Sequence, residues 1–127
     1  MARILVCEDD PNVREVIVEA LTQAGHQVLE AERGDVALQL ASTYLPALVL
    51  TNDDQPGLTG EALLWQLRRD PRLACTPVIF VTGFAERIST AARQEAMALI
   101  EKPFRTSQLL AVVQRVLGGE EIQEETG

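Results

Sequence analysis

Hydrophobic residues along this chain gather into five short runs, and each run is followed by a polar or glycine-containing break. The runs cover residues 3–7, 27–31, 48–51, 77–82 and 98–100. Apolar runs of this length, bounded by turn-forming residues, are typical of buried strands. The hydrophobic pattern therefore predicts five strands.

The stretches between the runs carry apolar residues at a different spacing. In residues 13–24, 37–44, 63–67 and 109–117 these residues recur every three or four positions, which is the spacing of one helical face. The stretch 86–95 has a narrower apolar stripe, so we expect the least firmly packed helix there. Each predicted strand is thus followed by a predicted helix.

Strands that alternate with helices at short spacing predict an α/β fold. We expect a parallel sheet with helices on both faces and right-handed crossovers. The chain has 127 residues, which is enough for one domain with a substantial core. We assign residues 1–119 to this domain, with Gly118-Gly119 ending the last helix, and interpret residues 120–127 as an acidic tail or the start of a linker.

Composition and charge exclude several classes of protein. The longest apolar run is far shorter than the roughly 20 residues that span a bilayer, and the run after Arg3 is too short for a signal-peptide core. We therefore expect a cytoplasmic protein with no membrane contact. The net charge of −8 argues against direct binding to nucleic acid. Cys7 and Cys75 form neither a disulfide framework nor a zinc pattern, so we interpret both as structural.

Chemically active side chains follow four of the five predicted strands. Ligands bind beyond the carboxyl ends of parallel strands, so these groups should meet at one edge of the sheet. Carboxylates there would suit Mg²⁺, and a hydroxyl and an ammonium would suit phosphoryl oxygens. An alternative is that the acids only cap a helix and that the lysine is solvated. The groups are Glu8 and Asp9, residues 52–54, Thr82, and Lys102.

The order and spacing of these groups resemble the receiver domain of response regulators, the CheY-like family of two-component signalling. The resemblance spans about residues 2–118 and implies a flavodoxin-like sheet of five parallel strands in the order 2-1-3-4-5, with helices on both faces. It rests on the segment 4–11 with Arg14, on Pro56-Gly57 with Gly60, on Val81-Thr82, and on the segment 101–104.

The resemblance also implies an unusual phosphoacceptor position. In such domains an aspartate four residues before the Pro-Gly turn accepts a phosphoryl group from a histidine kinase, and here that position is Asn52. An amide has no anionic oxygen to attack phosphorus. Asp53 lies one residue closer to Pro56, and its side chain should point to the opposite face, so we expect it to be a poor substitute.

Around Asn52, some positions match the pattern of the receiver family and others depart from it. Several departures lie around one site, since Gln55 and Thr59 replace the usual Met and Asp, and they favour a naturally divergent receiver; the alternative is a designed Asp-to-Asn substitution. Leu99 stands at the switch position, where an aromatic residue is common. By the resemblance, Mg²⁺ would be held by Glu8, Asp9 and the backbone carbonyl of Asp54, and the phosphoryl oxygens would be contacted by Thr82 and Lys102.

Asn52 should also change the response of the site to Mg²⁺. Two like charges 4 to 5 Å apart repel by roughly 3 to 4 kcal/mol at an effective dielectric constant near 20. An amide in place of one carboxylate removes that repulsion. We therefore expect a more stable metal-free fold and weaker Mg²⁺ binding than in an Asn52→Asp variant.

From these residues we predict a divergent, non-enzymatic receiver domain without catalytic residues. Its partner would be a histidine kinase or another signalling protein, or a second copy of the chain in a homodimer. The family's output face here includes residues 86–96, Leu99 and residues 105–117. Two alternatives stay open: a phosphoacceptor that uses Asp53, Asp54 or a converted Asn52, and a structural adaptor domain of a larger protein.

Overall fold

Five strands form a single parallel sheet in the order β2-β1-β3-β4-β5. The computed structural model describes residues 1–119, so the tail predicted at 120–127 lies outside the described residues. The observed order confirms the predicted α/β fold and strand order. The strands are β1 (Arg3–Cys7), β2 (Gln27–Ala31), β3 (Leu48–Thr51), β4 (Val78–Thr82) and β5 (Ala98–Glu101).

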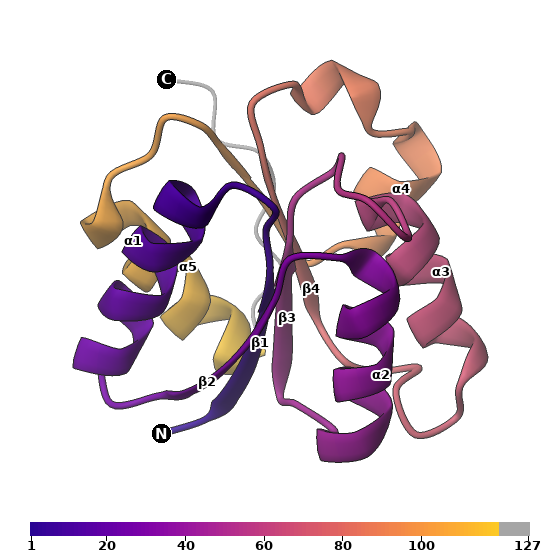
Figure 1. The fold of residues 1–127 in the computed structure, drawn as a ribbon, viewed down its shortest axis with the longest axis horizontal. Coiled ribbons are helices and arrows are strands. Elements are labelled where there is room, and N and C mark those ends of the chain that lie inside the picture. Colours follow the sequence, from indigo (N-terminus) through magenta and orange to yellow (C-terminus); the bar gives the residue numbers. More distant parts are fainter. Residues whose placement is uncertain (120–127) are drawn as a thin grey trace.

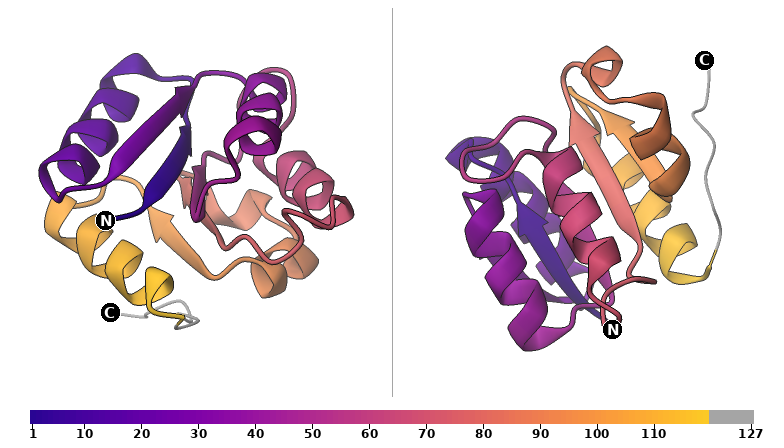
Figure 2. Two further views of the ribbon diagram at one scale, coloured as in Figure 1. Left: turned by 90° about the horizontal axis from the view of Figure 1, so that it is seen from below. Right: turned by 90° about the vertical axis from the view of Figure 1, so that its right-hand side faces the viewer.

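Helices cover both faces of this sheet. Helices α1 and α5 pack on one face, and α2, α3 and α4 pack on the other (Figures 1 and 2). In the described part of the chain, no helix is long and apolar enough to cross a membrane. The helices are α1 (Pro11–Gln23), α2 (Gly34–Tyr44), α3 (Gly60–Arg69), α4 (Thr90–Glu95) and α5 (Thr106–Leu117), with a 3₁₀ turn, η1 (Ala85–Arg87), before α4.

The inner strands β1, β3 and β4 are largely apolar because helices bury both faces of the sheet around them. In β1, Ile4 and Val6 join the core under α1 and α5, whereas Leu5 and Cys7 join the core under α2, α3 and α4. All four side chains are at most 1% exposed. Burial of each such aliphatic side chain stabilises the fold by about 1.5 to 3 kcal/mol. This two-sided core fixes the position of each strand end.

The strand ends bring the predicted chemistry to one edge, the upper edge in Figure 1. Cys7 of β1 is level with Thr51 of β3, so the next residues, Glu8 and Asn52, are neighbours. The backbone N–H of Asn52 donates to the carbonyl of Cys7 at 3.0 Å. Side chains alternate along a strand, so Glu8 and Asn52 leave the sheet on the same side.

The segment between β4 and β5 differs from the single helix expected over residues 86–95. The turn η1 ends at Arg87, and the next residue, Ile88, is extended at φ −86° and ψ 128°. Ser89 then caps α4, because its side chain accepts a hydrogen bond from the backbone N–H of Ala92 at 3.1 Å. A serine cap after an extended, buried isoleucine starts a new helix, so the expected helix is shorter and begins later.

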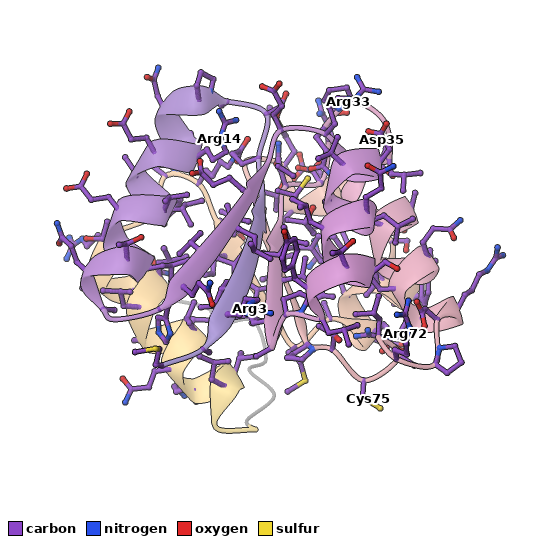
Figure 3. The ribbon with its side chains drawn as sticks, turned by 60° about the horizontal axis from the view of Figure 1, so that its bottom comes forward. Arg3, Arg14, Arg33, Asp35, Arg72 and Cys75 are labelled. Carbon is purple, nitrogen blue, oxygen red and sulfur yellow. The ribbon has the colours of Figure 1, made fainter. Side chains whose placement is uncertain are left out.

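The two cysteines lie in different environments. Cys7 is buried in β1, and burial raises the pKa of its thiol to about 12. Cys75 is exposed in the loop after α3, at the end of the molecule opposite Arg33 and Asp35 (Figure 3). Neither cysteine forms a disulfide.

This difference predicts which thiol reacts. At about pH 8, the thiolate is the reactive form, so the native protein should gain one iodoacetamide adduct, at Cys75. Cys7 should react only after denaturation. Intact mass and peptide mapping check this, with Cys75→Ser as the control that gains no adduct in the native state. An adduct on Cys7 in the folded protein would contradict the buried β1.

Candidate functional site

The side-chain amide of Asn52 lies at the centre of the candidate site. Its nitrogen, Nδ2, donates to Asp9 Oδ1 at 3.2 Å, to the backbone carbonyl of Asp54 at 3.2 Å and to Glu8 Oε2 at 3.4 Å. Its oxygen accepts from the backbone N–H of Asp53 at 2.9 Å. The residue is 9% exposed, and these neighbours together determine which way the amide points.

Glu8 and Lys102 form a shielded ion pair beside this amide. Lys102 Nζ donates to Glu8 Oε1 at 2.6 Å, and the backbone N–H of Asp10 donates to Glu8 Oε2 at 3.1 Å. The Glu8 side chain is 2% exposed and that of Lys102 is 21% exposed. Burial raises the pKa of Glu8, and the hydrogen bond from Lys102 opposes that rise. The pair joins the ends of β1 and β5 across β3 and β4.

Helix α1 holds the end of β1 in place. Arg14 Nη1 donates to the backbone carbonyl of Glu8 at 2.8 Å. Asp10 is the helix cap, and its carboxylate accepts from the backbone N–H groups of Asn12 and Val13. Asp10 therefore caps the helix. Glu8 and Asp9 do not cap it; their side chains accept hydrogen bonds from Asn52 instead.

The family resemblance implies that Thr82 contacts phosphoryl oxygens, but in this structure its partner is Asp53. Its hydroxyl donates to Asp53 Oδ1 and accepts from the backbone N–H of Phe84 at 2.9 Å. The sequence pattern alone does not link Asp53 with Thr82, but the register of β3 and β4 does. Thr51 pairs with Phe80, so the residues two positions further along, Asp53 and Thr82, are also level.

The loop after β3 is held by a buried glutamine. Gln55 is 5% exposed, and its Nε2 donates to the hydroxyl of Thr51 at 3.2 Å and to the carbonyl of Leu58 at 2.9 Å. The start of α2 closes on the same loop. Gly34 N–H donates to the carbonyl of Pro56 at 2.8 Å, and a Cβ on Gly34 would collide with the carbonyl of Leu58.

An open hollow of about 300 Å³ adjoins the site. Arg87 from η1 stands at its rim, with Nη1 3.8 Å from Asp54 Oδ2 and its guanidinium 4.0 Å from the centre of the Phe84 ring. Leu99, at the expected switch position, is partly buried and packs on the core under α2, α3 and α4. The lining residues of the hollow are Asp53, Asp54, Thr59, Glu61 and Arg87.

The three predicted magnesium ligands lie close together, but the side-chain nitrogen of Asn52 already donates hydrogen bonds to all of them. Within residues 1–119, no group of three or more His, Cys, Asp or Glu side chains is placed to hold a metal. Two carboxylates and the carbonyl of Asp54 surround Asn52 Nδ2, and such oxygens suit Mg²⁺. Asn52 Nδ2 donates to these same oxygens, so a cation would bind them only by displacing these hydrogen bonds.

Comparison with known proteins agrees with this fold. The chain is 36% identical to protein PilH of Pseudomonas aeruginosa over 121 residues, which is 94% of this chain and 100% of PilH. Seven other curated relatives are longer, and the chain spans between 8% and 51% of their length.

Solved structures give the same result. The chemotaxis response regulator CheY4 of Vibrio cholerae matches with a TM-score of 0.82 and 27% identity, over 91% of this chain and 98% of CheY4. The receiver domain of sensor histidine kinase PA1611 from Pseudomonas aeruginosa, which has a magnesium ion in its active-site cleft, matches with a TM-score of 0.85 and 25% identity over 92% of this chain and 98% of that domain.

A model of the response regulator receiver domain matches residues 4–114. That match includes every residue assigned to the candidate site, from Glu8 to Lys102. Receiver domains are signalling domains of two-component systems, and this chain belongs to the response regulator receiver family.

Proposed function

We propose that this receiver domain signals through protein binding in the cytoplasm, without accepting a phosphoryl group and without enzymatic turnover. The observation that carries the proposal is Asn52 at the acceptor position. Its amide oxygen carries no formal negative charge to attack phosphorus, and that oxygen already accepts the N–H of Asp53. The acceptor position is therefore occupied by a group that binds its neighbours instead of reacting.

The proposed partner is a histidine kinase or another signalling protein. We place the contact on the face formed by α4, β5 and α5, with Leu99 at its centre. Among residues 1–119 strand β5 is an edge strand, because only β4 pairs with it there, and α5 lies beside it. The same face is the proposed interface of a homodimer. The net charge of −8 supports protein partners over nucleic acid.

Mg²⁺ belongs to the proposal as a weakly bound ion. Glu8, Asp9 and the carbonyl of Asp54 would hold it, and the ion would supply positive charge to the two carboxylates. The support comes from the convergence of these three groups and from the magnesium ion in the PA1611 receiver domain. Asn52 lowers the affinity, because its N–H group binds the same oxygens.

The test is intact mass after incubation with a small phosphodonor and Mg²⁺. We expect no phosphoryl adduct on the native protein and one adduct on Asn52→Asp, because only the variant has a carboxylate beside Lys102 at this position. Asn12→Asp, which changes the only other asparagine, should stay unmodified.

An adduct on the native protein would refute the proposal. Peptide mapping would then locate it at Asp53, at Asp54 or at an Asn52 converted to aspartate.

A further inference from the structure

Three oxygens that the site would offer to a cation share one nitrogen as their donor. Asn52 Nδ2 lies 3.2 Å from Asp9 Oδ1, 3.2 Å from the carbonyl oxygen of Asp54 and 3.4 Å from Glu8 Oε2. The amide nitrogen carries two hydrogens, so the three acceptors share them. Two of the acceptors, Glu8 and Asp9, follow β1, and the third, Asp54, lies in the loop after β3, so the nitrogen links the ends of two neighbouring strands.

The direction of the amide is fixed from its other side. Asn52 Oδ1 accepts the backbone N–H of Asp53 at 2.9 Å. A flipped amide would lose that bond and would place its oxygen against two carboxylates and a carbonyl, which are all acceptors. The nitrogen therefore faces the three oxygens, because the opposite orientation would lose the bond from Asp53 and set one acceptor against three others.

The local charge balance does not require a metal either. Two carboxylates accept from the Asn52 nitrogen; the ammonium of Lys102 compensates that of Glu8, which leaves the charge of Asp9 as the uncompensated one of the two. A carboxylate at position 52 would leave two negative charges and no hydrogen-bond donor between them. The side chain of Asp54 does not add to this charge, because it is 73% exposed and points to Arg87.

We infer that the amide nitrogen of Asn52 is a built-in substitute for the divalent cation and holds the metal ligands together without an ion. This inference deepens the proposed function and rests on its placement of the metal ligands, but it does not depend on any partner. It also goes beyond relief of charge repulsion. Relief alone would make any neutral side chain at position 52 equivalent, whereas a substitute for the cation requires the N–H donors.

Asn52→Ala separates these two explanations, because alanine is neutral but has no donor. The native protein should melt at the same temperature, within about 1 °C, in chelator and in Mg²⁺. With Mg²⁺ about a hundredfold above the dissociation constant, the melting temperature of Asn52→Asp should rise by roughly 5 to 10 °C. Asn52→Ala should also be stabilised by Mg²⁺, by a smaller amount, and Asn12→Asp should behave as the native protein does.

Two outcomes of the melting experiment would overturn the inference. One is a native protein that Mg²⁺ stabilises as much as it stabilises Asn52→Asp. The other is an Asn52→Ala variant that folds and is as insensitive to Mg²⁺ as the native protein, because the donors would then have no role.

A second measurement on the native protein decides the matter if Asn52→Ala does not fold. The chain has two asparagines, and the Asn12→Asp and Asn52→Asp variants assign their side-chain amide signals in ¹⁵N spectra. The amide protons of Asn52 should exchange with solvent at least about tenfold more slowly than those of exposed Asn12, and Mg²⁺ should not shift them. Equal exchange rates would overturn the inference.

Phosphodonor treatment of the same proteins keeps the two proposals apart. A native chain that becomes phosphorylated but ignores Mg²⁺ in melting would refute the proposed function and leave the substitute cation in place. A native chain that resists the phosphodonor but is stabilised by Mg²⁺ would do the reverse.

Discussion

Replacement of Lys102 by methionine is expected to lower the free energy of unfolding by about 3 to 5 kcal/mol, which is the usual cost of leaving one member of a buried ion pair alone. Glu8 is 1% exposed, so water cannot replace the lost ammonium. The amide of Asn52 and the N–H of Asp10 would remain as its donors. A drop in melting temperature of roughly 10 to 20 °C should accompany the loss.

The loss should depend on pH in a defined direction. Burial raises the pKa of Glu8, and removal of Lys102 should raise it further. An acid whose pKa is higher in the folded state binds its proton more tightly there, so its ionisation costs stability. The defect of Lys102→Met should therefore be largest above the folded pKa of Glu8 and should shrink as the pH falls toward the ordinary pKa of 4.5.

Urea denaturation at neutral and at acidic pH measures both effects. Arg33→Met is the matched control, because Arg33 and Asp35 form an exposed pair, with side chains 48% and 53% exposed. Its expected cost is below about 1 kcal/mol. A Lys102→Met variant as mild as this control, or equally destabilised at both pH values, would contradict the buried pair.

Gly60→Ala is expected to destabilise the protein by about 2 to 3 kcal/mol, the range for overpacking at a site that cannot relax. A Cβ on Gly60 would overlap the backbone carbonyl of Asn52 and lie 3.0 Å from the Phe80 ring. Alanine is favoured over glycine in a helix by about 1 kcal/mol, but the obstacle is a backbone atom held by the site. Either the start of α3 or the Asn52 segment must shift.

Gly83→Ala is the control for this clash, because a Cβ there meets no atom within 4 Å. It should change stability by less than about 0.5 kcal/mol. Chemical denaturation compares the two variants, and the side-chain amide signal of Asn52 should move in Gly60→Ala alone. Equal stability of the two variants would show that α3 does not approach Asn52 as closely as described.

Much of the fold follows from the hydrophobic pattern because the sheet is covered on both faces. Each apolar run, such as residues 78–82, supplies alternate side chains to two cores, so the runs stand out in the sequence. The polar residue after each run then falls at the sheet edge. The strand order came from the family resemblance, since periodicity identifies strands but does not say which of them pair.

Other parts of the site could not be predicted, because they depend on tertiary contacts. The bond between Thr82 and Asp53 requires the register of β3 and β4. The direction of the Asn52 amide requires the N–H of Asp53 and three acceptors, two from the segment after β1 and one from the loop after β3. The break at Ile88 arises because this residue is buried in an extended conformation, which a weak apolar stripe does not reveal.

The contact between the start of α2 and the loop after β3 limits how the site can move. Gly34 bonds to Pro56 and leaves no space for a side chain against Leu58, while Gln55 ties the same loop to Thr51. The segment that carries Asn52 and Asp54 is therefore tied to the start of α2 by a hydrogen bond and by close backbone packing. Mutations or ligands that displace the start of α2 would act on the site from a helix that contributes no group to it.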